Sequence, residues 1–593
     1  MFDQIIVFLT LLLALFLFAQ GRLRYDLVAL LALLSVTLTG VIDSQDAFLG
    51  FGQPQVITVA SILVITRGLS NSGIDEVITR LLESVSSRST SVQVLSLTTA
   101  VAVLSAFMNN VGALALLMPV TFRMSDRAGI PVSKLLMPLA FGSLLGGMTT
   151  AIGTPPNLII SGFRQEVKGM PFEIFEFTPV GLGVAVACIL FIGIVGWRLI
   201  PLRKAAGSGE DLFSIEEGYV TELRVPPSSV LANKTILSLE HLVDVDATIV
   251  ATIHDEHRRY NPSGTTIIRP NDVLIVQATA KDLTEMTAKM GLEMVGSKGL
   301  SMRDIRSDEV ILSEAVVKNT SPLVYRTVRD INLRGRFGIN LLAVARQGAR
   351  VEERLREISF RPGDILLFQG PTERLSQTIQ SLGCLPLPQR DIDFIKGEKR
   401  PFLALGIFSV AIFLTALGYL PVHLSFPTAA VAMVLTSLLS LRQAYQNIDW
   451  TILILLGAMI PVGQALEVSG GAQTIANFIL QFSGTSHPLV SLGLLMVVTM
   501  TLSDIINNAA AAVLLAPIGI NIASALGVSP DPFLIAIALA ASCAFMTPIG
   551  HQSNTLILGP GGYRFTDYWR MGLPVQIIVL ATAIPLIWIV WPF

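Results

Sequence analysis

Hydrophobic residues dominate two long regions of the chain, and a polar region separates them. The apolar regions cover about 1–200 and 401–593, and each is long enough for about five membrane-spanning helices of roughly 20 residues. The region between them has the residue pattern of an ordinary soluble protein. This arrangement predicts an α-helical polytopic membrane protein with an inserted cytoplasmic α+β region.

About five spans are predicted in each apolar half, and the fourth of each is interrupted. In the first half they lie near Ile5–Phe18, Leu27–Val41, Val56–Thr66, Lys134–Phe163 and Pro179–Ile200; in the second half they lie near Phe402–Leu420, Phe426–Leu439, Trp450–Leu466, Phe533–Leu558 and Leu573–Trp591. Between the third and fourth spans of each half lies a segment with two adjacent asparagines, near Val92–Thr121 and Leu489–Ile520. We expect each segment to form one re-entrant hairpin.

The two halves repeat the same motifs in the same order. "LSAFMNNVGALALLMP" from Leu104 matches "LSDIINNAAAAVLLAP" from Leu502 at a single offset. "TAIGTPPN" from Thr150 then matches "TPIGHQSN" from Thr547 after the loss of one residue. Because chance does not explain so many matches in one order, we interpret the chain as an internal duplication. An odd number of spans per half turns the second copy upside down, which predicts an inverted repeat.

Basic short loops indicate the orientation, because lysine and arginine accumulate on the cytoplasmic side of a membrane. "GRLR", "FRMSDR" and "WRLIPLRK" in the first half and "LRQAYQ" and "GYRFTDYWR" in the second fall on one side if the N-terminus is outside. The expected location is therefore the plasma (inner) membrane, with many passes, a cytoplasmic insert and both termini outside. The first apolar run is interpreted as a span rather than a signal peptide, since its basic residues follow it.

The composition agrees with this class. Of the 593 residues, 52% are hydrophobic and only 14% are charged, whereas a soluble chain carries about 25% charged residues. The net charge of -2 gives no reason to expect a nucleic-acid partner. The polar region shows no nucleophile–base pair, metal-ligand cluster or phosphate-binding loop, so neither an enzyme nor a cofactor is expected.

The "GTPPN" motif cannot continue as a helix, because Pro155 and Pro156 remove backbone donors and disfavour helical geometry before them. Within hydrocarbon, such a break survives only where protein or a water-filled cavity satisfies the freed groups. Asparagine and backbone carbonyls and serine hydroxyls suit a small cation such as Na+, and half-helix N-termini favour an anion. The alternative is that the asparagines only bond between packed helices. Two pairs in matching frames favour ligands, and the pattern is typical of secondary transporters.

Two residues of the second half have no counterpart of the same kind in the first. Asp504 stands where the first half has Ala106, and His551 replaces Thr154. An intramembrane carboxylate is a functional candidate, so Asp504 either tunes cation affinity or carries a proton, or it simply pairs with a nearby amide or hydroxyl. His551 is interpreted as a neutral donor at the rim of the site, with a proton-linked role as the alternative.

The hairpin motifs and the interrupted "GTPPN" helix resemble the divalent anion/sodium symporter family of the ion-transporter superfamily, over both membrane halves. Each hairpin tip of that family reads Ser-Asn-Thr, whereas the tips here read Asn-Asn-Val from Asn109 and Asn-Asn-Ala from Asn507. The missing threonines favour a smaller oxyanion such as sulfate over a dicarboxylate. The resemblance also implies a homodimer and an elevator-type movement.

From the residues and this resemblance together, three sets of site residues are expected. Na+ site 1 comprises Ser105, Asn109, Asn110 and Gly153; Na+ site 2 comprises Ser503, Asn507, Asn508 and Gly550; the substrate site comprises Asn110, Val111, Gly112, Thr154, Pro155, Asn157, Asn508, Ala509, His551 and Asn554, with Asp504 as a tuning residue.

The insert contains two similar units. "IIRPNDVLIVQA" from Ile267 and "SFRPGDILLFQG" from Ser359 each read as an Arg-Pro-x-Asp turn that leads into a buried strand. They resemble the C-terminal lobe of regulator-of-potassium-conductance domains in two tandem copies, which implies either a sensor of an unknown small ligand or a dimerisation module. The expected domains are membrane repeat 1 over 1–201, regulatory-type domains over 202–300 and 301–398, and membrane repeat 2 over 399–593.

The function expected from these features is Na+-coupled symport of a small divalent oxyanion, sulfate first, by a lipid-embedded carrier. A di- or tricarboxylate symporter and an arsenite- or silicate-type exporter use the same architecture and remain alternatives. A membrane sensor is the alternative class, but a receptor has no need for two oppositely oriented half-sites.

Overall fold

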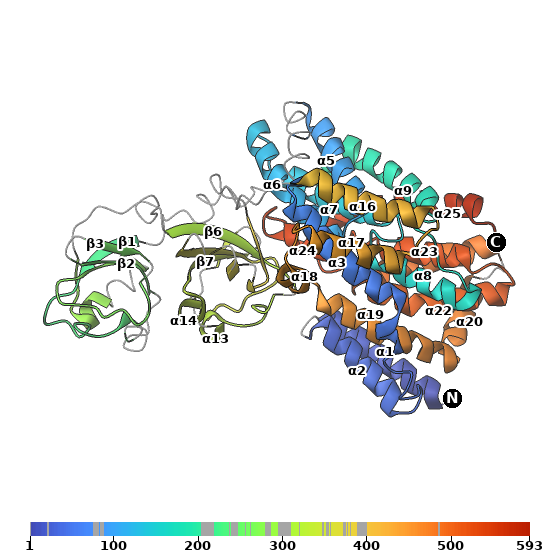
Figure 1. The fold of residues 1–593 in the computed structure, drawn as a ribbon, viewed down its shortest axis with the longest axis horizontal. Coiled ribbons are helices and arrows are strands. Elements are labelled where there is room, and N and C mark those ends of the chain that lie inside the picture. Colours follow the sequence, from blue (N-terminus) through green and yellow to red (C-terminus); the bar gives the residue numbers. More distant parts are fainter. Residues whose placement is uncertain are drawn as a thin grey trace. The chain divides into compact units, whose positions relative to one another are not determined.

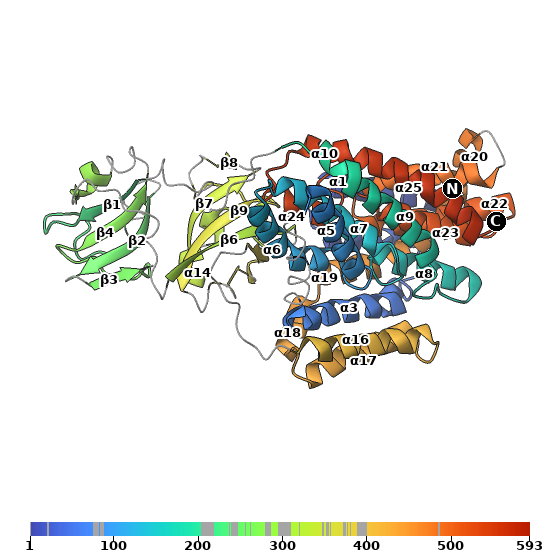
Figure 2. The ribbon, with the colours of Figure 1, turned by 90° about the horizontal axis from the view of Figure 1, so that it is seen from above.

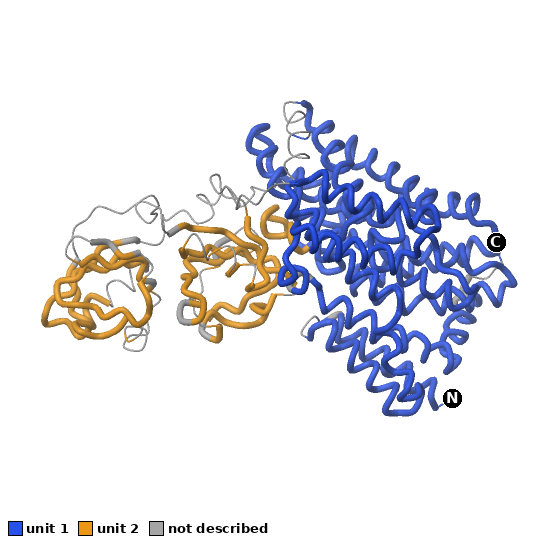
Figure 3. The backbone as a smooth tube through the Cα atoms, in the orientation of Figure 1, with its two compact units in different colours: residues 1–202, 393–554, 564–593 blue, residues 203–392, 555–563 orange. Residues whose placement is uncertain are grey.

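The computed structural model describes the chain from Phe2 to Phe593 with several gaps. Outside the description lie residues 1, 21–22, 75–81, 83–87, 203–218, 237, 239–246, 255–256, 261, 279–285, 295–309, 320, 332, 347–348, 352–354, 356, 372–374, 376–377, 380, 388–399 and 484–486. The predicted domain boundaries at 300–301 and 398–399 fall in these gaps. The described chain divides into two compact units (Figure 3). Unit 1 comprises Met1–Leu202, Asp393–Asn554 and Arg564–Phe593, and unit 2 comprises Arg203–Ile392 with Thr555–Tyr563.

Unit 1 is helical, and its helices follow the two apolar halves of the sequence (Figure 1). The first half forms α1 (Phe2–Gln20), α2 (Tyr25–Leu38), η1 (Leu49–Gly52), α3 (Pro54–Asn71), α5 (Thr90–Ser105), α6 (Asn110–Ala128), α7 (Ser133–Gly147), α8 (Pro155–Lys168), α9 (Thr178–Phe191), η2 (Ile192–Gly196) and α10 (Trp197–Leu199). The second half forms α16 (Pro401–Ala416), α17 (Val422–Leu435), α18 (Leu441–Asn447), α19 (Trp450–Val468), α20 (Gly471–Ser483), α21 (Pro488–Ser503), α22 (Asn508–Leu526), α23 (Asp531–Ala541), α24 (Gln552–Leu558), η4 (Phe565–Asp567) and α25 (Tyr568–Val590).

Four helical segments among the described residues are long and apolar enough to cross a membrane. They are Thr178–Leu199, Trp450–Val468, Asn508–Leu526 and Phe565–Val590. Several shorter apolar helices accompany them, including α1, α2 and α16. These features are those of a polytopic membrane protein, as the sequence predicts.

The two predicted interruptions are confirmed. α7 ends at Gly147 and α8 begins only at Pro155, with both prolines in the first turn of the new helix. α23 ends at Ala541, and α24 begins at Gln552. Proline is tolerated in a first helical turn because its missing N–H has no intrahelical partner there. The asparagine segments also fold as predicted into two helices joined at the asparagines, α5 with α6 and α21 with α22.

Packing in unit 1 joins helices from both halves. α3 packs beside α16 and α17 (Figure 2), and α19 packs against α2 and α22. α7 lies close to α5 because Gly142 and Gly146 face it; a β-carbon on Gly142 would lie 2.7 Å from side-chain atoms of Thr98 and Val101. Small residues allow helices to approach in this way in membranes, where apolar burial gives little driving force.

Unit 2 contains two antiparallel five-stranded sheets, with the strand orders β3-β2-β4-β1-β5 and β10-β6-β9-β7-β8. Read in reverse, the second order is β8-β7-β9-β6-β10, which matches the first strand for strand. The strands are β1 (Tyr219–Arg224), β2 (Ala247–His254), β3 (His257–Tyr260), β4 (Val273–Ala278), β5 (Glu293–Met294), β6 (Val310–Val317), β7 (Asn340–Arg346), β8 (Ala349–Arg350), β9 (Ile365–Pro371) and β10 (Cys384–Pro386). Each sheet has its own buried apolar core.

The Arg-Pro-x-Asp turns lead into central strands β4 and β9, as predicted. In each turn the aspartate accepts a hydrogen bond of 2.8 Å from the backbone N–H of the arginine, Asp272 from Arg269 and Asp364 from Arg361. Asp364 also pairs with the guanidinium of Arg346 through two bonds of 2.8 Å. These bonds close the turn and fix the start of the strand that follows.

Candidate functional site

The first asparagine pair lies at the tip between α5 and α6. Asn109 is the N-cap of α6, and its side-chain oxygen accepts a bond of 3.0 Å from the backbone N–H of Val111. Asparagine is a preferred residue at this position because its oxygen satisfies a free N–H of the first turn. The cap leaves Asn110, the first residue of the helix, pointing into the protein, where it is almost fully buried.

Oxygen atoms surround the amide of Asn110. One of its terminal atoms lies 2.7 Å from the Ser105 hydroxyl, 3.1 Å from the Ser143 carbonyl and 3.2 Å from the Gly153 carbonyl. An amide N–H in that place donates to all three groups, and this orientation satisfies both the amide and its neighbours. Three of the residues expected in Na+ site 1, Ser105, Asn110 and Gly153, therefore meet.

The first break is held against the hairpin by one hydrogen bond, and a second bond braces the break itself. Thr150 donates its hydroxyl to the Ala106 carbonyl, and Asn157 donates its side-chain amide to the Thr150 carbonyl at 2.7 Å. Gly153 must be glycine, because a β-carbon there would lie 2.9 Å from the Ser105 carbonyl oxygen and closer still to the Gly147 carbonyl oxygen. The loop can therefore approach the hairpin tip closely enough to offer its carbonyl to Asn110.

The second half repeats these contacts. Asn507 caps α22 by accepting from Ala509 N–H at 2.9 Å, and Ser503 donates to Asn508 at 2.9 Å. Thr547 donates to the Asp504 carbonyl at 2.6 Å, and Asn554 donates to the Thr547 carbonyl at 3.0 Å.

The loop of the second break approaches its hairpin in the same way. A β-carbon on Gly550 would lie 2.6 Å from the Ser503 carbonyl oxygen, so this position also requires glycine. Of the residues expected in Na+ site 2, Ser503 thus contacts both Asn508 and Gly550.

Four buried polar atoms in this region have no hydrogen-bond partner among the described residues. They are Thr154 Oγ1, Asn157 Oδ1, Asn508 Nδ2 and Asn554 Oδ1. A buried polar group without a partner costs about 1–3 kcal/mol, so native proteins rarely retain one without a purpose. The set contains both donors and acceptors, and the two acceptors occupy corresponding positions in the two breaks.

The two breaks lie next to each other. The Ser143 hydroxyl on α7 donates to the Ser553 hydroxyl on α24 at 3.3 Å, and the rings of Phe141 and Phe545 are 4.9 Å apart. A small pocket opens on the first break between α3, α8 and α19, and its lining includes Asn109, Gly153 and Pro155. The elements expected to enclose one site are therefore adjacent.

Comparison with known proteins places the chain in a family. Residues 13–527 and 469–592 match the family model described as the citrate transporter. The chain belongs to this citrate transporter family. It is 30% identical to an uncharacterized transporter of Synechocystis sp. over 97% of this chain and 95% of the relative. It is 31% identical to the uncharacterized transporter YfbS of Escherichia coli over 98% of both. Sodium/sulfate cotransporter 2 of Chlamydomonas reinhardtii is 26% identical over 57% of this chain and 40% of the relative.

In this member of the citrate transporter family, Asp504 lies behind the second hairpin tip. Its carboxylate accepts bonds from Gln576 Nε2 at 2.7 Å and from Met546 N–H at 2.9 Å. Gln576 lies on α25, and it also donates to the Cys543 carbonyl at 2.9 Å. The alternative interpretation of Asp504, as a residue paired with a nearby amide, is confirmed. Its role in tuning cation affinity stays a prediction. The sequence motifs did not indicate Gln576, because it lies on a later span.

His551 has a local role at the start of α24. Its Nδ1 accepts a bond of 3.0 Å from the backbone N–H of Ser553, as an N-cap side chain does. The remaining residues expected at the substrate site are at or beside the hairpin tips. Ala509 is buried, and Gly112 faces α3, where a β-carbon would lie 3.0 Å from the Thr66 methyl carbon.

An ion-pair network joins the helices on either side of the two breaks. Arg164 on α8 pairs with Asp531 at the start of α23 at 3.2 Å and with Glu176 at 3.3 Å. Lys168 pairs with the same aspartate at 2.7 Å. Asp531 is only 5% exposed, so these cations stabilise a carboxylate held away from water, and Glu176 balances the second positive charge.

Proposed function

We propose that the protein is a secondary active transporter that uses Na+ to carry a small divalent oxyanion, with sulfate as the first substrate to test. The observation that carries this proposal is the matched pair Asn157 and Asn554. Each donates its amide to the threonine of its own break, and each keeps its side-chain oxygen buried and without a partner among the described residues. Two equivalent free acceptors in apolar surroundings suit bound cations, so each oxygen is proposed as a further ligand of the cation beside its own hairpin tip.

The proposed Na+ sites lie at the two hairpin tips. Site 1 consists of Ser105, Asn110 and Gly153, with Asn109 holding the tip, and site 2 consists of Ser503, Asn508 and Gly550, with Asn507 in the same role. The contacts around Asn110 support site 1, because its amide nitrogen donates to three oxygens within 3.2 Å and so gathers them at one place. The Ser503–Asn508 bond and the close approach of Gly550 support site 2.

The anion is proposed to bind between the two tips. The free donors there are the Thr154 hydroxyl and the Asn508 amide. The N-termini of α6 and α22, which begin at the asparagines, add a favourable dipole for negative charge. Val111 and Ala509 lack hydroxyls, which leaves few donors for a large polycarboxylate.

Relatives give further support for this substrate class. The names of several partial relatives in Chlamydomonas reinhardtii state sodium/sulfate cotransport. The family description names citrate, so a tricarboxylate is the second candidate substrate.

We further propose that the halves form an inverted repeat in the plasma membrane and that a homodimer moves its hairpins by an elevator mechanism. The same hydrogen bonds at both breaks support a repeated unit. Unit 2 is proposed to regulate transport, either as a sensor of a small ligand or as a contact between protomers.

Uptake of labelled sulfate into proteoliposomes, with and without an inward Na+ gradient, tests the proposal. We expect Na+-dependent uptake that falls at least tenfold in Asn110→Ala and in Asn508→Ala, because each removes ligands from one cation site. Asn521→Ala is the matched control; that amide also lies on α22 but donates only to the Pro517 carbonyl of its own helix. Sulfate uptake that depends neither on Na+ nor on the two site substitutions contradicts the proposal. Binding of sulfate without uptake indicates a sensor.

A further inference from the structure

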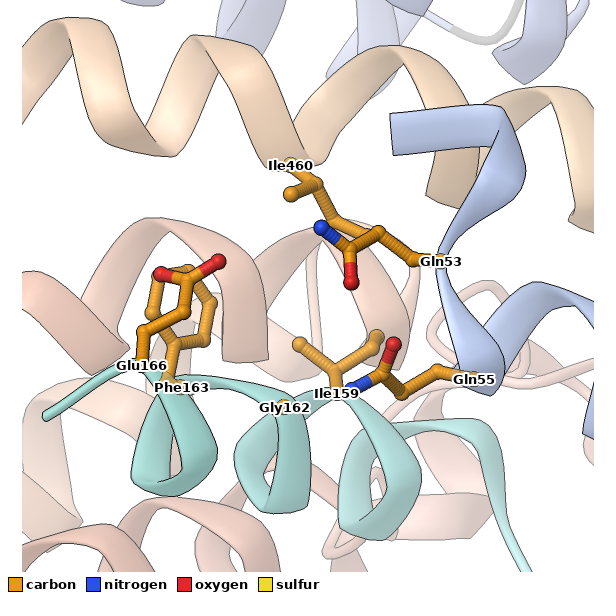
Figure 4. Close-up of a pocket in the computed structure, with 7 residues that line it drawn as sticks. All are labelled: Gln53, Gln55, Ile159, Gly162, Phe163, Glu166 and Ile460. Carbon is orange, nitrogen blue, oxygen red and sulfur yellow. The ribbon is translucent and has the colours of Figure 1, made fainter. Parts of the chain in front are cut away.

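A second small pocket lies in the same groove between α3, α8 and α19 but away from the hairpin tips. Its lining consists of Gln53, Gln55, Ile159, Gly162, Phe163, Glu166 and Ile460 (Figure 4). On α19, Ile460 stands eight residues beyond Ile452, which lines the pocket at the first break. Eight residues of helix correspond to about 12 Å along α19, whereas on α8 the linings meet at Leu158 and Ile159, so the two pockets are neighbouring positions along one groove.

Gln55 shows that this pocket is built to hold something polar. Its side chain is only 8% exposed, and its oxygen has no hydrogen-bond partner among the described residues. The amide nitrogen packs on Gly162, where a β-carbon would collide with it, so the orientation of the side chain is fixed by α8. In Figure 4 the side-chain oxygens of Gln53 and Gln55 point toward each other across the pocket.

The charges near the pocket favour a cation. Glu166 lines it, accepts a bond of 3.3 Å from Gln464, and also interacts electrostatically with Glu467. The neighbouring cations of α8, Arg164 and Lys168, are engaged with Asp531 and Glu176. The pocket therefore faces the Glu166 carboxylate, and no cation from α8 compensates it.

Size and ligand type narrow the choice further. The enclosed part of the pocket admits about one water-sized species, which Na+ matches and a sulfate ion exceeds. Two amide oxygens and one carboxylate are hard oxygen ligands, and a single negative charge suits a monovalent ion better than a divalent one. We propose that Gln53, Gln55 and Glu166 form a peripheral Na+ site, distinct from the two sites proposed at the hairpin tips.

Equilibrium binding of ²²Na+ to the purified full-length protein, without any anion, tests this site. Gln55→Leu is expected to remove one bound Na+ per chain, because it deletes the buried oxygen. Gln55→Glu keeps the shape of the side chain and adds charge, so it is expected to tighten binding at this site at least threefold. Gln165→Leu is the matched control, since Gln165 is an exposed glutamine on α8, next to Glu166, that does not line the pocket.

The outcomes separate this site from the central ones. The double variant Asn110→Ala/Asn508→Ala is expected to still bind the Na+ ion of the peripheral site. If it loses other Na+ ions, that loss tests only the sites proposed at the hairpin tips. The peripheral site is overturned if neither Gln55→Leu nor Gln55→Glu changes ²²Na+ binding. It is also overturned if the variants change the binding of labelled sulfate instead. Gln55→Glu keeps the test decisive even if Gln55→Leu fails to fold.

Discussion

The half-site at Asn110 and the half-site at Asn508 share their hydrogen bonds but differ in charge. In both, a threonine of the break donates to the hairpin and an asparagine donates to that threonine's carbonyl. Only the second has a carboxylate behind the tip, where Asp504 receives bonds from Gln576 and Met546. The first has Ala106 in that place.

This difference shows which residues set the geometry and which adjust it. The threonine–asparagine bonds and the glycine contacts occur in both copies, so they hold the break against the hairpin. The carboxylate is present in one copy and absent from the other without altering those bonds, so it changes the electrostatic environment of one half-site. The following experiments test that division, in order of decreasing expected effect.

The glycines of the breaks provide the severest test of shared geometry. Gly153→Ala and Gly550→Ala should each lower uptake more than tenfold, because the added carbon would meet backbone carbonyls that cannot move aside. Such overpacking costs about 1–3 kcal/mol. Uptake per folded protein and thermal unfolding measure both effects. Gly406→Ala on α16 is the control, since nothing lies within 4 Å of its new carbon. If only one break glycine proves sensitive, the two half-sites do not share their geometry.

Removal of the charge at Asp504 tests the difference between the copies. Asp504→Asn keeps the shape but removes a negative charge behind the second tip, and a loss of about 1.4 kcal/mol of attraction for the cation corresponds to roughly tenfold in affinity. We expect the Na+ concentration for half-maximal uptake to rise by up to that factor. An unchanged Na+ dependence of uptake would show that the Asp504 carboxylate contributes only to folding. In that case the variant should have a lower melting temperature.

His551→Thr makes the second break resemble the first at that position. Threonine can cap a helix in the same way as the His551 nitrogen, so uptake should change less than threefold. The dependence of uptake on pH should also stay the same between pH 6 and 8. A loss of pH dependence in the variant would instead assign a proton-linked role to the histidine.

The two similar sheets of unit 2 can also be compared, through the pH dependence of their stability. This is the smallest of the expected effects. Burial raises the pKa of Glu314 on β6 to about 7. Since its folded pKa exceeds the ordinary value of 4.5, the native sheet binds the proton more tightly, and the sheet loses stability as pH rises from about 4.5 to 7. Glu314→Gln should flatten that dependence. Hydrogen exchange of the β6 amides, corrected for the intrinsic effect of pH, measures it; Glu222→Gln on β1 is the matched variant in the other sheet.

Local sequence signals were sufficient to predict where the helices that carry the site begin and end. The prolines after Thr154 and the asparagine pairs mark where helices end and begin, because they act on their own backbone. The matching offsets then predicted which residues meet, and Ser105, Asn110 and Gly153 do meet.

The sequence did not reveal the partners that come from distant helices. Gln576 lies 72 residues after Asp504, and Gln55 reaches its pocket only because Gly162 on α8 leaves room for it. A lone glutamine near an apolar run has no periodicity or spacing that indicates such a role. The role of such a glutamine depends on how distant helices pack together, and one sequence does not show that packing directly.

The bonds from Arg164 and Lys168 to Asp531 have a consequence for separating the two halves of the chain. One copy supplies the positive side chains and the other supplies the acid. The second half expressed alone would keep a buried carboxylate without these counter-charges, whereas in the first half Arg164 would still have Glu176. The second half therefore depends on the first for the charge that balances Asp531.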